Sequence, residues 1–351
     1  MIDASFSLAQ RLQRAWLTRG ALAIAMLPLA LVYGAITATR RALYRVGVLR
    51  ALALPVPVVV VGNLVAGGAG KTPTVIAIVA ALRRHGRTPG IVSRGYGGSH
   101  VDGPLGVTRA ISAAQCGDEP LLMHLRSGAP LVVGRDRVGA ARELLRRHRQ
   151  VDVVVSDDGL QHLALARDAQ VIVFDERGAG NGWLLPAGPL RDPLPRAVPA
   201  ASLVVYNAAA PSTPLPGTLA RSGLVGVLAL DAWWHGEAAS VAALEALRHR
   251  TFVAAAGLAR PERFFAMLRA HGLAFTPLPL PDHHAYATLP WPPDTADVVL
   301  TEKDAIKLDP ARIGATRVWV APLDFALDAA FDAALLALLA RTGPRHGNTP
   351  A

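Results

Sequence analysis

The 351-residue sequence predicts an α/β fold, with a largely parallel sheet in one domain and a smaller α/β domain after it. Two observations predict this fold. After Arg50, short runs rich in valine, isoleucine and leucine alternate with helix-like stretches, which is the order found in βαβ units. A segment rich in proline and small residues, 208–218, then interrupts the alternation before it resumes, which indicates a linker between two domains.

The expected strands are short apolar runs in which β-branched residues are frequent. In the first domain they fall at residues 56–61, 90–93, 131–133, 151–156, 169–174 and 203–206. In the second they fall at 225–230, 251–256, 298–301 and 318–321, with helices at 261–271 and 328–341. The chain then divides into an N-terminal apolar helix (1–50), a core (51–207), the linker (208–218), a C-terminal α/β domain (219–341) and a disordered tail (342–351).

Composition narrows the class of partner. The net charge is +10 although only 18% of the residues are charged, and such a basic balance suggests an acidic partner: a nucleotide, a nucleic acid or an anionic membrane. Aromatic residues make up 5% of the chain, and no basic run is interleaved with them as base stacking would require, so we expect no nucleic-acid partner. The single cysteine, Cys116, excludes an internal disulfide and fits a reducing compartment.

Lysine is scarce. Of the 36 basic residues only three are lysines: Lys71, Lys303 and Lys307. A composition that replaces lysine by arginine wherever either cation serves will keep lysine where a compact ammonium is needed and a planar guanidinium does not fit. The three lysines are therefore candidates for special roles.

Residues 20–39 carry no charge and are flanked by arginines on both sides. A stretch of roughly 20 apolar residues is just long enough to cross a bilayer. Pro28 in its middle and the flanking arginines equally suit a kinked helix that lies in the membrane interface, and a buried core helix is the structural alternative. We expect this segment to attach the protein to a membrane, with the remaining chain in the cytosol.

Residues 58–72, "VVVVGNLVAGGAGKT", join a buried-type strand to a glycine-rich bend and the start of an apolar-periodic helix. This is the context of a phosphate-binding P-loop, since glycines let backbone N–H groups approach oxygen atoms and the helix N-terminus adds positive charge. Lys71 would reach the β and γ phosphates and the Thr72 hydroxyl would bind Mg²⁺. A bare glycine turn is the alternative. The predicted nucleotide-binding residues are Val65, Ala66, Gly67, Gly68, Ala69, Gly70, Lys71 and Thr72.

One position departs from the usual P-loop pattern: Val65 occupies the place of the first glycine, five residues before Gly70. A second motif supports a nucleotide site nonetheless. Asp157 and Asp158 directly follow the buried-type strand "VVVS", as the metal-holding carboxylate of a P-loop protein should. Adjacent carboxylates repel each other unless a cation lies beside them, so a metal explains the pair better than a helix cap does.

Five further polar segments lie in expected loops: "SRGYGG" (93–98), "CGDEP" (116–120), "GNGWLLPAGPLRDP" (180–193), "DHHAYA" (282–287) and "TEKDAIK" (301–307). A single histidine or aspartate in any one of them would be read as structural. Together they indicate a functional site, because catalytic and binding residues are concentrated on loops.

With these motifs in their order along the chain, the sequence resembles the tetraacyldisaccharide 4'-kinase family, the lipid A 4'-kinases of Gram-negative bacteria. The resemblance covers nearly the whole chain and rests on "VGNLVAGGAGKTP", "SRGYGG", "GDEP", "SDDGLQH", "GNGWLLPAGPLRDP", "DHHAY" and "TEKDAIK". Members of the family likewise lack a glycine at the position of Val65 and carry an apolar N-terminal helix that docks on the inner membrane. Where the family more often has glutamate, this chain has Asp192.

The resemblance implies a P-loop NTPase-like kinase core that transfers the γ-phosphoryl of ATP, with Mg²⁺, to the 4'-hydroxyl of a tetraacylated glucosamine disaccharide 1-phosphate, a lipid A precursor. It further implies action at the cytoplasmic face of the inner membrane. We expect Asp118 to be the base, oriented or tuned by His283, with His284 a weaker candidate. The expected catalytic residues are Lys71, Asp118 and His283, the metal ligands Thr72, Asp157, Asp158 and Asp192, and the substrate-binding residues Arg94, Tyr96, Gln161, His162, Asn181 and Arg191.

Two other classes remain open from the P-loop alone. A P-loop GTPase or metal-insertion chaperone shares the sheet and the double aspartate, but its guanine-reading Asn/Thr-Lys-x-Asp spacing fails in "TEKD", where lysine and aspartate are adjacent. An ATP-driven membrane-transport subunit would carry a signature helix motif that is not found in the sequence.

Overall fold

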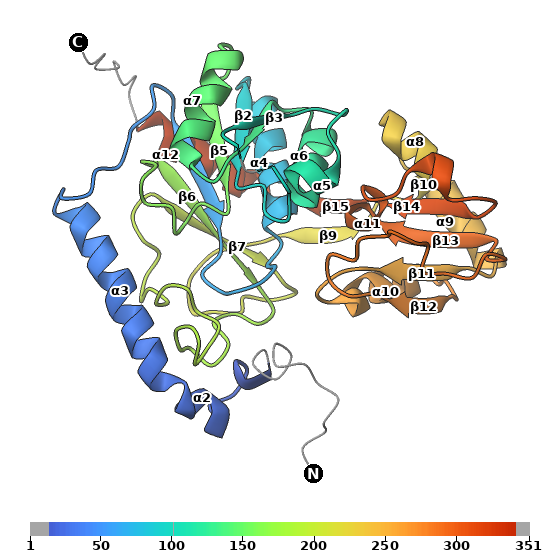
Figure 1. Ribbon diagram of the computed structural model, residues 1–351, viewed down its shortest axis with the longest axis horizontal. Coiled ribbons are helices and arrows are strands. Elements are labelled where there is room, and N and C mark those ends of the chain that lie inside the picture. Colours follow the sequence, from blue (N-terminus) through green and yellow to red (C-terminus); the bar gives the residue numbers. More distant parts are fainter. Residues whose placement is uncertain (1–13, 101, 342–351) are drawn as a thin grey trace. The chain divides into compact units, whose positions relative to one another are not determined.

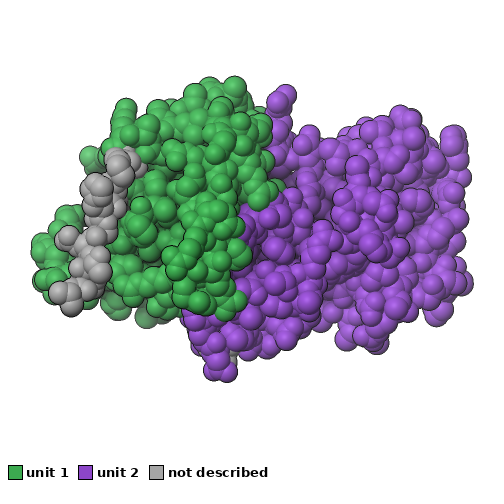
Figure 2. All heavy atoms as spheres, turned by 90° about the horizontal axis from the view of Figure 1, so that it is seen from above, with its two compact units in different colours: residues 1–93, 136–220, 327–351 green, residues 94–135, 221–326 purple. Residues whose placement is uncertain are grey.

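The computed structural model describes residues 14–100 and 102–341 (Figure 1). The segment 342–351, which we expect to be a disordered tail, lies outside the described residues. The chain forms two compact units: unit 1 comprises residues 1–93, 136–220 and 327–351, and unit 2 comprises residues 94–135 and 221–326 (Figure 2). Each unit is built from segments that are far apart in the sequence.

The sheet of unit 1 is parallel, and it confirms the predicted fold class. Its strands lie in the order β2-β5-β1-β6-β7-β8, and each neighbouring pair runs parallel. Their bounds are Val58–Gly62 (β1), Pro89–Ser93 (β2), Val153–Asp157 (β5), Ala169–Asp175 (β6), Ser202–Asn207 (β7) and Thr218–Leu219 (β8). Every residue of β1, β2 and β5 is buried, which explains why these strands are continuous apolar runs rather than alternating ones. Because all strands point the same way, their carboxyl ends lie along one edge, where ligands of such sheets bind.

Three helices cover this sheet: α4 (Lys71–Arg84), α7 (Arg137–Arg147) and α12 (Ala329–Ala340). α4 begins directly after Gly70, whose φ of 87° ends the glycine bend and sets the helix N-terminus beside the sheet edge. α12 packs against α4, β6 and β7 through Phe331, Leu335 and Leu339, all buried. α12, the last helix among the described residues, therefore completes the unit that contains β1.

The apolar N-terminal stretch forms two helices, α2 (Ala21–Ala25) and α3 (Leu27–Arg45). They separate at Met26, and Pro28 lies in the first turn of α3, where its missing N–H has no helical partner to lose. No helix within the described residues combines the length and the hydropathy needed to cross a membrane. Most side chains of both helices are exposed, which is not the burial pattern of a core helix.

Unit 2 is a second α/β unit, with a five-stranded sheet in the order β10-β14-β13-β11-β12. Its strands are Leu228–Ala229 (β10), Val253–Ala256 (β11), Thr276–Pro279 (β12), Asp297–Thr301 (β13) and Arg317–Ala321 (β14), and only β10 runs antiparallel. The helices of this sheet are α8 (Leu230–His235), α9 (Val241–Ala246), α10 (Pro261–Ala270) and α11 (Glu302–Ala305), with 3₁₀ turns at Leu247–His249 and Pro310–Arg312. Phe252, Phe264 and Phe265 lie at the centre of its core.

The remaining elements of unit 2 are two antiparallel strand pairs and two helices. β3 (Leu105–Val107) pairs with β4 (Leu131–Val133), and β9 (Arg221–Leu224) pairs with β15 (Leu323–Ala326). The helices α5 (Ala113–Cys116) and α6 (Asp118–Ser127) follow one another, separated only by Gly117 at φ 94°. α6 packs against β3, β4 and α11.

The division into units differs from the predicted domain bounds in three segments. Residues 94–135, predicted in the core, belong to unit 2, and residues 327–341, predicted in the C-terminal domain, belong to unit 1. The predicted linker 208–218 returns to the sheet, since the Tyr206 hydroxyl donates to the Leu215 carbonyl (2.6 Å) and Thr218 begins β8. Of the strand predicted at 225–230, only Leu228–Ala229 (β10) is confirmed. Leu230 begins α8 and is buried with Trp233 on one helix face.

Membership of α12 in unit 1 gives a stability prediction. Leu335→Ala should destabilise unit 1 by about 2–5 kcal/mol, since the leucine is 1% exposed and its loss leaves a cavity. Hydrogen exchange of the α4 and β6 amides should become faster. Leu336→Ala, at a half-buried position of the same helix, is the matched control and should have a smaller effect. Equal losses in the two variants, or faster exchange confined to unit 2, would contradict the assignment.

Candidate functional site

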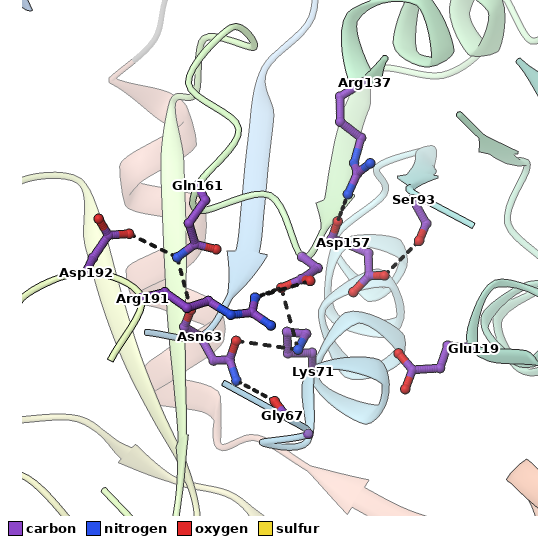
Figure 3. Close-up of polar contacts among 12 residues, drawn as sticks. Asn63, Gly67, Lys71, Ser93, Glu119, Arg137, Asp157, Gln161, Arg191 and Asp192 are labelled. Atoms are coloured by element: carbon purple, nitrogen blue, oxygen red, sulfur yellow. Dashed lines mark hydrogen bonds and ion pairs between the residues drawn. The ribbon is translucent and has the colours of Figure 1, made fainter. Parts of the chain in front are cut away.

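The glycine bend after β1 is held open around Lys71 (Figure 3). The Asn63 side-chain amide donates to the Gly67 carbonyl (2.9 Å), and its oxygen lies 3.4 Å from Lys71 Nζ. Gly67 and Gly70 have φ values of 91° and 87°, which favour glycine. The lysine side chain is only 10% exposed, and its ammonium also lies 3.5 Å from Asp158 Oδ1. The loop thus places a compact cation between an amide and a carboxylate at the sheet edge.

Val65, the residue that departs from the usual pattern, is fully buried. It forms an antiparallel bridge with Leu190, and the N–H of Ala66 donates to the Pro189 carbonyl (2.8 Å). The N–H of Arg191 in turn donates to the Leu64 carbonyl (2.7 Å). Strand-like pairing with the 183–192 loop therefore supports the first half of the bend, at the place where other P-loops use a glycine turn.

A further residue, Arg177, supports the second half of the bend. Its guanidinium donates to the carbonyls of Ala66 (3.2 Å) and Gly68 (2.9 Å), and its Nε is held by Asp175, which is fully buried at the end of β6. Carbonyl groups bound to Arg177 leave the peptide N–H groups of the bend to face a phosphate. Neither Arg177 nor Asn63 is among the predicted site residues. The available signal was their position, directly after a buried strand of the parallel sheet.

The double aspartate lies at the carboxyl end of β5, as predicted. Asp157 is buried and accepts a hydrogen bond from the Ser93 hydroxyl (2.8 Å), and Arg137 donates to its backbone carbonyl (3.4 Å). Asp158, at φ 46°, lies within ion-pair distance of Lys71 (3.5 Å) and Arg191 (3.3 Å). The two carboxylates differ, since Asp157 is fixed within the sheet edge and Asp158 is one-third exposed among cations.

The donor set at this edge fits Mg²⁺. This ion prefers oxygen ligands and is usually bound through one or two carboxylates together with phosphate oxygens and water. The Thr72 hydroxyl at the start of α4 and the Asp157 and Asp158 carboxylates supply that chemistry. Within residues 14–100 and 102–341, no group of three or more His, Cys, Asp or Glu side chains is placed to hold a metal ion.

Asp192, the fourth predicted metal ligand, has protein partners instead. Its carboxylate forms an ion pair with Arg41 of α3 and accepts a hydrogen bond from the Gln161 side chain (3.0 Å). Gln161 also donates to the Asn63 carbonyl (3.3 Å), so it joins the 183–192 loop to the glycine bend. The structure places Asp192 between α3 and this loop, and direct metal contact by its shorter side chain stays a prediction.

Unit 2 holds the predicted acid–histidine pair. Asp118, the first residue of α6, is 7% exposed, and its Oδ2 lies 2.8 Å from Nδ1 of His283. Gly117 at φ 94° turns the chain into α6, and His283 is itself in the left-handed region at φ 58°. The sequence separation is 165 residues, yet one hydrogen bond joins the two motifs "GDEP" and "DHHAY".

Electrostatics fix the charge state of the pair. Burial alone would raise the pKa of the Asp118 carboxyl, but the hydrogen bond from His283 and the charges of Lys303, His283 and Lys307 outweigh it and hold this pKa well below its ordinary value. The hydrogen bond to Asp118 raises the pKa of His283 above its ordinary 6.5, against the opposing effect of burial. The nearby Cys116 is no competing nucleophile, since burial raises the pKa of its thiol to about 11.

The predicted substrate-binding residues are distributed over both units. In unit 2, Arg94 is exposed and Tyr96 is 74% exposed, with its ring 6.4 Å from the His283 ring. In unit 1, Arg191 lies at Asp158, and His162 is half-buried, with its pKa lowered by burial.

Two candidates, Asn181 and His284, have structural contacts. Asn181 is buried, and its amide donates to the carbonyls of Ala187 (2.9 Å) and Thr18 (3.1 Å), so it holds the loop and the N-terminal segment together. His284 packs edge-on against Tyr286, with ring centroids 4.7 Å apart, and accepts the Tyr286 N–H. These contacts leave His283 as the histidine that meets Asp118.

Comparisons with known proteins agree with this geometry. The family model described as "Tetraacyldisaccharide-1-P 4'-kinase" (LpxK) matches residues 22–340. The tetraacyldisaccharide 4'-kinase of Methylibium petroleiphilum is 56% identical over 95% of both chains, and that of Leptothrix cholodnii is 56% identical over 96% of this chain and 98% of its own. A crystal structure of LpxK from Aquifex aeolicus in complex with ATP is similar with a TM-score of 0.73 and 27% identity, covering 91% of this chain and 99% of that one.

The resemblance predicted from the motifs is confirmed, as are the predicted kinase class and ATP as the nucleotide. The GTPase or chaperone and the transport subunit are thereby set aside. The chain belongs to the tetraacyldisaccharide-1-P 4'-kinase family.

Proposed function

We propose that the chain transfers the γ-phosphoryl group of ATP to the 4'-hydroxyl of a tetraacylated glucosamine disaccharide 1-phosphate, with the glycine bend holding the phosphates and the Asp118–His283 pair receiving the hydroxyl proton. Family membership supports the reaction. The observation that carries the division of roles is the 2.8 Å contact of Asp118 with His283, since a sugar hydroxyl is a poor nucleophile and needs a base.

The residues of unit 1 bind and neutralise phosphate. Lys71, positioned by Asn63, supplies a point charge to the β and γ phosphates. The bend supplies peptide N–H groups, and Arg177 binds the carbonyl groups of the same bend. When bound, Mg²⁺ neutralises phosphate charge, and Thr72, Asp157 and Asp158 would hold it. Since phosphoryl transfer depends mainly on positioning and charge, these contacts are the larger part of the catalysis expected from this unit.

The residues of unit 2 accept the proton. Asp118 with a strongly lowered pKa is by itself a weak base, so the pair accepts the proton as one unit, with His283 stabilising the protonated state. The unit is competent when the imidazole is neutral. The pKa of His283 is raised above 6.5. Turnover should therefore increase as pH rises through this raised pKa, and it should be lost as pH falls below it, where the imidazole is protonated.

The exposed face of α2 and α3 supports attachment to the inner-membrane surface. Leu29, Val32 and Ile36 lie on one stripe of α3 and are 57%, 58% and 63% exposed. Beside this stripe, the Tyr33 hydroxyl donates to the Arg191 carbonyl (3.0 Å), and one turn or more further round the helix Arg41 pairs with Asp192. A helix that is held to the protein by Tyr33 and Arg41 and still exposes an apolar stripe suits a place in the interface of an anionic bilayer, with its arginines at the headgroups. The same proposal places the protein at the cytoplasmic face of the membrane, where it would meet its lipid substrate.

Lys71→Ala should lower phosphoryl transfer by about three orders of magnitude or more, the size expected for loss of a fixed positive group at the transferred phosphate. Lys71→Arg should also fail, since a planar fork does not fit between Asn63 and Asp158. Transfer is measured with labelled ATP and a bacterial lipid extract, and Arg142→Ala, an exposed position of α7, is the control. Near-normal turnover by the arginine variant would contradict the role given to a compact ammonium.

Asp118→Asn should leave ATP affinity intact and lower turnover by roughly two to four orders of magnitude, the usual span for a general base. His283→Ala should lose turnover by the same route, and the double variant should be little worse than the worse single one. Asp309→Asn, which changes an exposed aspartate of the same unit, should behave as wild type.

The residual activity of Asp118→Asn carries a second signature. The largest cause of the raised pKa of His283 is its hydrogen bond to Asp118, so the acid limb of the pH–rate profile should move to lower pH. Intact turnover in Asp118→Asn would exclude this aspartate as part of the base. Losses that simply multiply in the double variant would mean that the two residues act independently.

Replacing Leu29, Val32 and Ile36 together by glutamine should weaken binding to phosphatidylglycerol vesicles about a hundredfold, counting about 1 kcal/mol for each partly buried apolar side chain. ATP affinity should not change, because the Tyr33 and Arg41 contacts of α3 are kept. The matched control replaces Leu219, Val225 and Val241, which are 42%, 41% and 59% exposed elsewhere in the chain. Unchanged cosedimentation of the α3 variant with vesicles would place the attachment elsewhere.

A further inference from the structure

The motif "TEKDAIK" (301–307) has no role in the site described so far, yet it surrounds the acid–histidine pair. It forms the short helix α11 after β13, capped by the Thr301 hydroxyl, and the next residues turn back on it. Lys303 Nζ lies 2.6 Å from Glu119 Oε1, and Lys307 Nζ lies 3.4 Å from Asp118 Oδ2. Two lysines one helical turn apart thus meet two adjacent acids at the start of α6.

Lys307 is the more unusual of the two. Its side chain is 10% exposed, and its ammonium has no hydrogen-bond partner within the described part of the chain, so the ion pair with Asp118 is its contact there. Burying an ammonium is unfavourable unless nearby anions compensate. Asp118, 7% exposed, is the anion in ion-pair contact with it, and the charge of Lys307 also acts on the fully buried Asp304. In a chain with three lysines among 36 basic residues, this cation is one of those that arginine has not replaced.

The two carboxylate oxygens of Asp118 have different partners. Oδ2 faces both Nδ1 of His283 (2.8 Å) and Nζ of Lys307 (3.4 Å). Oδ1 accepts the backbone N–H of Glu119 (3.1 Å). A carboxylate that holds an imidazole and an ammonium on one oxygen is fixed in rotation, and its other oxygen keeps a lone pair for an incoming hydroxyl.

The same short helix also positions the histidine. The Asp304 carboxylate, fully buried, accepts the Gly257 N–H at 3.1 Å and the Thr301 hydroxyl at 2.6 Å. The Gly257 carbonyl in turn accepts the N–H of His283 (3.3 Å). A side chain larger than glycine would not fit at 257, since a Cβ there would lie 2.7 Å from Asp304 Oδ1. The 301–307 turn therefore contacts both members of the pair. Lys307 forms an ion pair with Asp118, and Asp304 binds Gly257, whose carbonyl accepts the His283 N–H.

We propose that Lys307 is a positioning residue for the phosphoryl transfer: its buried ammonium holds Oδ2 of Asp118 against His283 and keeps the pair anionic, which leaves Oδ1 to meet the acceptor hydroxyl. This inference rests on the proposed role of Asp118 as part of the base. Lys307 acts through Asp118 and needs no contact with either substrate.

The charges around the pair determine the sign of the expected effect. Asp118 faces His283, Lys303 and Lys307, with Glu119 beside it on α6, and His283 Nε2 lies 4.0 Å from Asp282. Removing the cation of Lys307 makes the pair easier to protonate. The acid limb of the pH–rate profile should therefore move to higher pH, opposite to its shift in Asp118→Asn.

The test compares Lys307→Met, which keeps the length of the side chain, and Lys307→Gln, which keeps a donor without a charge, with Arg312→Met, an exposed position of the same unit. ATP affinity, kcat and the pH–rate profile are measured for each. Both Lys307 variants should keep ATP affinity, lose about tenfold to a hundredfold in kcat from misplacement of the base, and show the shifted acid limb. The control should match wild type.

Combining Lys307→Met with Asp118→Asn separates this inference from the function on which it rests. With the carboxylate gone, the lysine substitution should change kcat by less than about twofold, since it has nothing left to act through. Losses that multiply, or a lower kcat without movement of the acid limb in both Lys307 variants, would overturn the positioning role. Full turnover in Asp118→Asn alone would instead overturn the proposed base.

Discussion

A glycine bend binds phosphate only if its peptide N–H groups point inward and its carbonyl groups find partners elsewhere. In this chain the Arg177 guanidinium meets that constraint by donating to the carbonyls of Ala66 and Gly68, and the buried Asp175 carboxylate holds the guanidinium in place. The pairing of Val65 with Leu190 does the same for the first half of the bend. The position of Lys71, the start of α4 and the approach of Asp158 all follow from a bend held in this shape.

The loop that supports the bend also contacts the apolar helix. The 183–192 loop bridges to Val65 on one side, and on the other its Arg191 carbonyl and Asp192 carboxylate bind Tyr33 and Arg41 of α3. Gln161 connects Asp192 to the backbone of Asn63. A continuous set of hydrogen bonds within unit 1 therefore joins the helix proposed to meet the membrane to the loop that holds the nucleotide.

Much of the fold was predictable because local signals were strong. Continuous β-branched runs marked the parallel strands of unit 1, and Asp328 and Pro261 marked the starts of α12 and α10. The mixing of segments between units was not predictable, since nothing local to residues 94–135 records which unit they join. Short edge strands such as β9 and β15 were missed for the same reason, because their pairing is decided by contacts 100 residues away.

For the site, motif chemistry predicted Lys71, the aspartate pair and the contact of Asp118 with His283, because these residue types in combination are typical of phosphate binding and proton transfer. Arg177 and Asn63 were missed because arginine and asparagine near a strand end are common, and only the geometry shows which carbonyls they bind. Asp192 pairs with Arg41 of α3, a contact that no sequence spacing indicated.

The interleaving of the two units has a consequence for synthesis on the ribosome. The chain passes between units at residues 93/94, 135/136, 220/221 and 326/327, so unit 1 is assembled from three segments. Its sheet emerges early, but α12, which covers α4, β6 and β7, is made last. The nucleotide-binding unit can therefore be completed only after α12 has been made, and apolar sheet surface stays uncovered while unit 2 can already fold. Nascent chains of this protein should depend on chaperones until α12 is released, and neither unit can be obtained by cutting the gene at a single point.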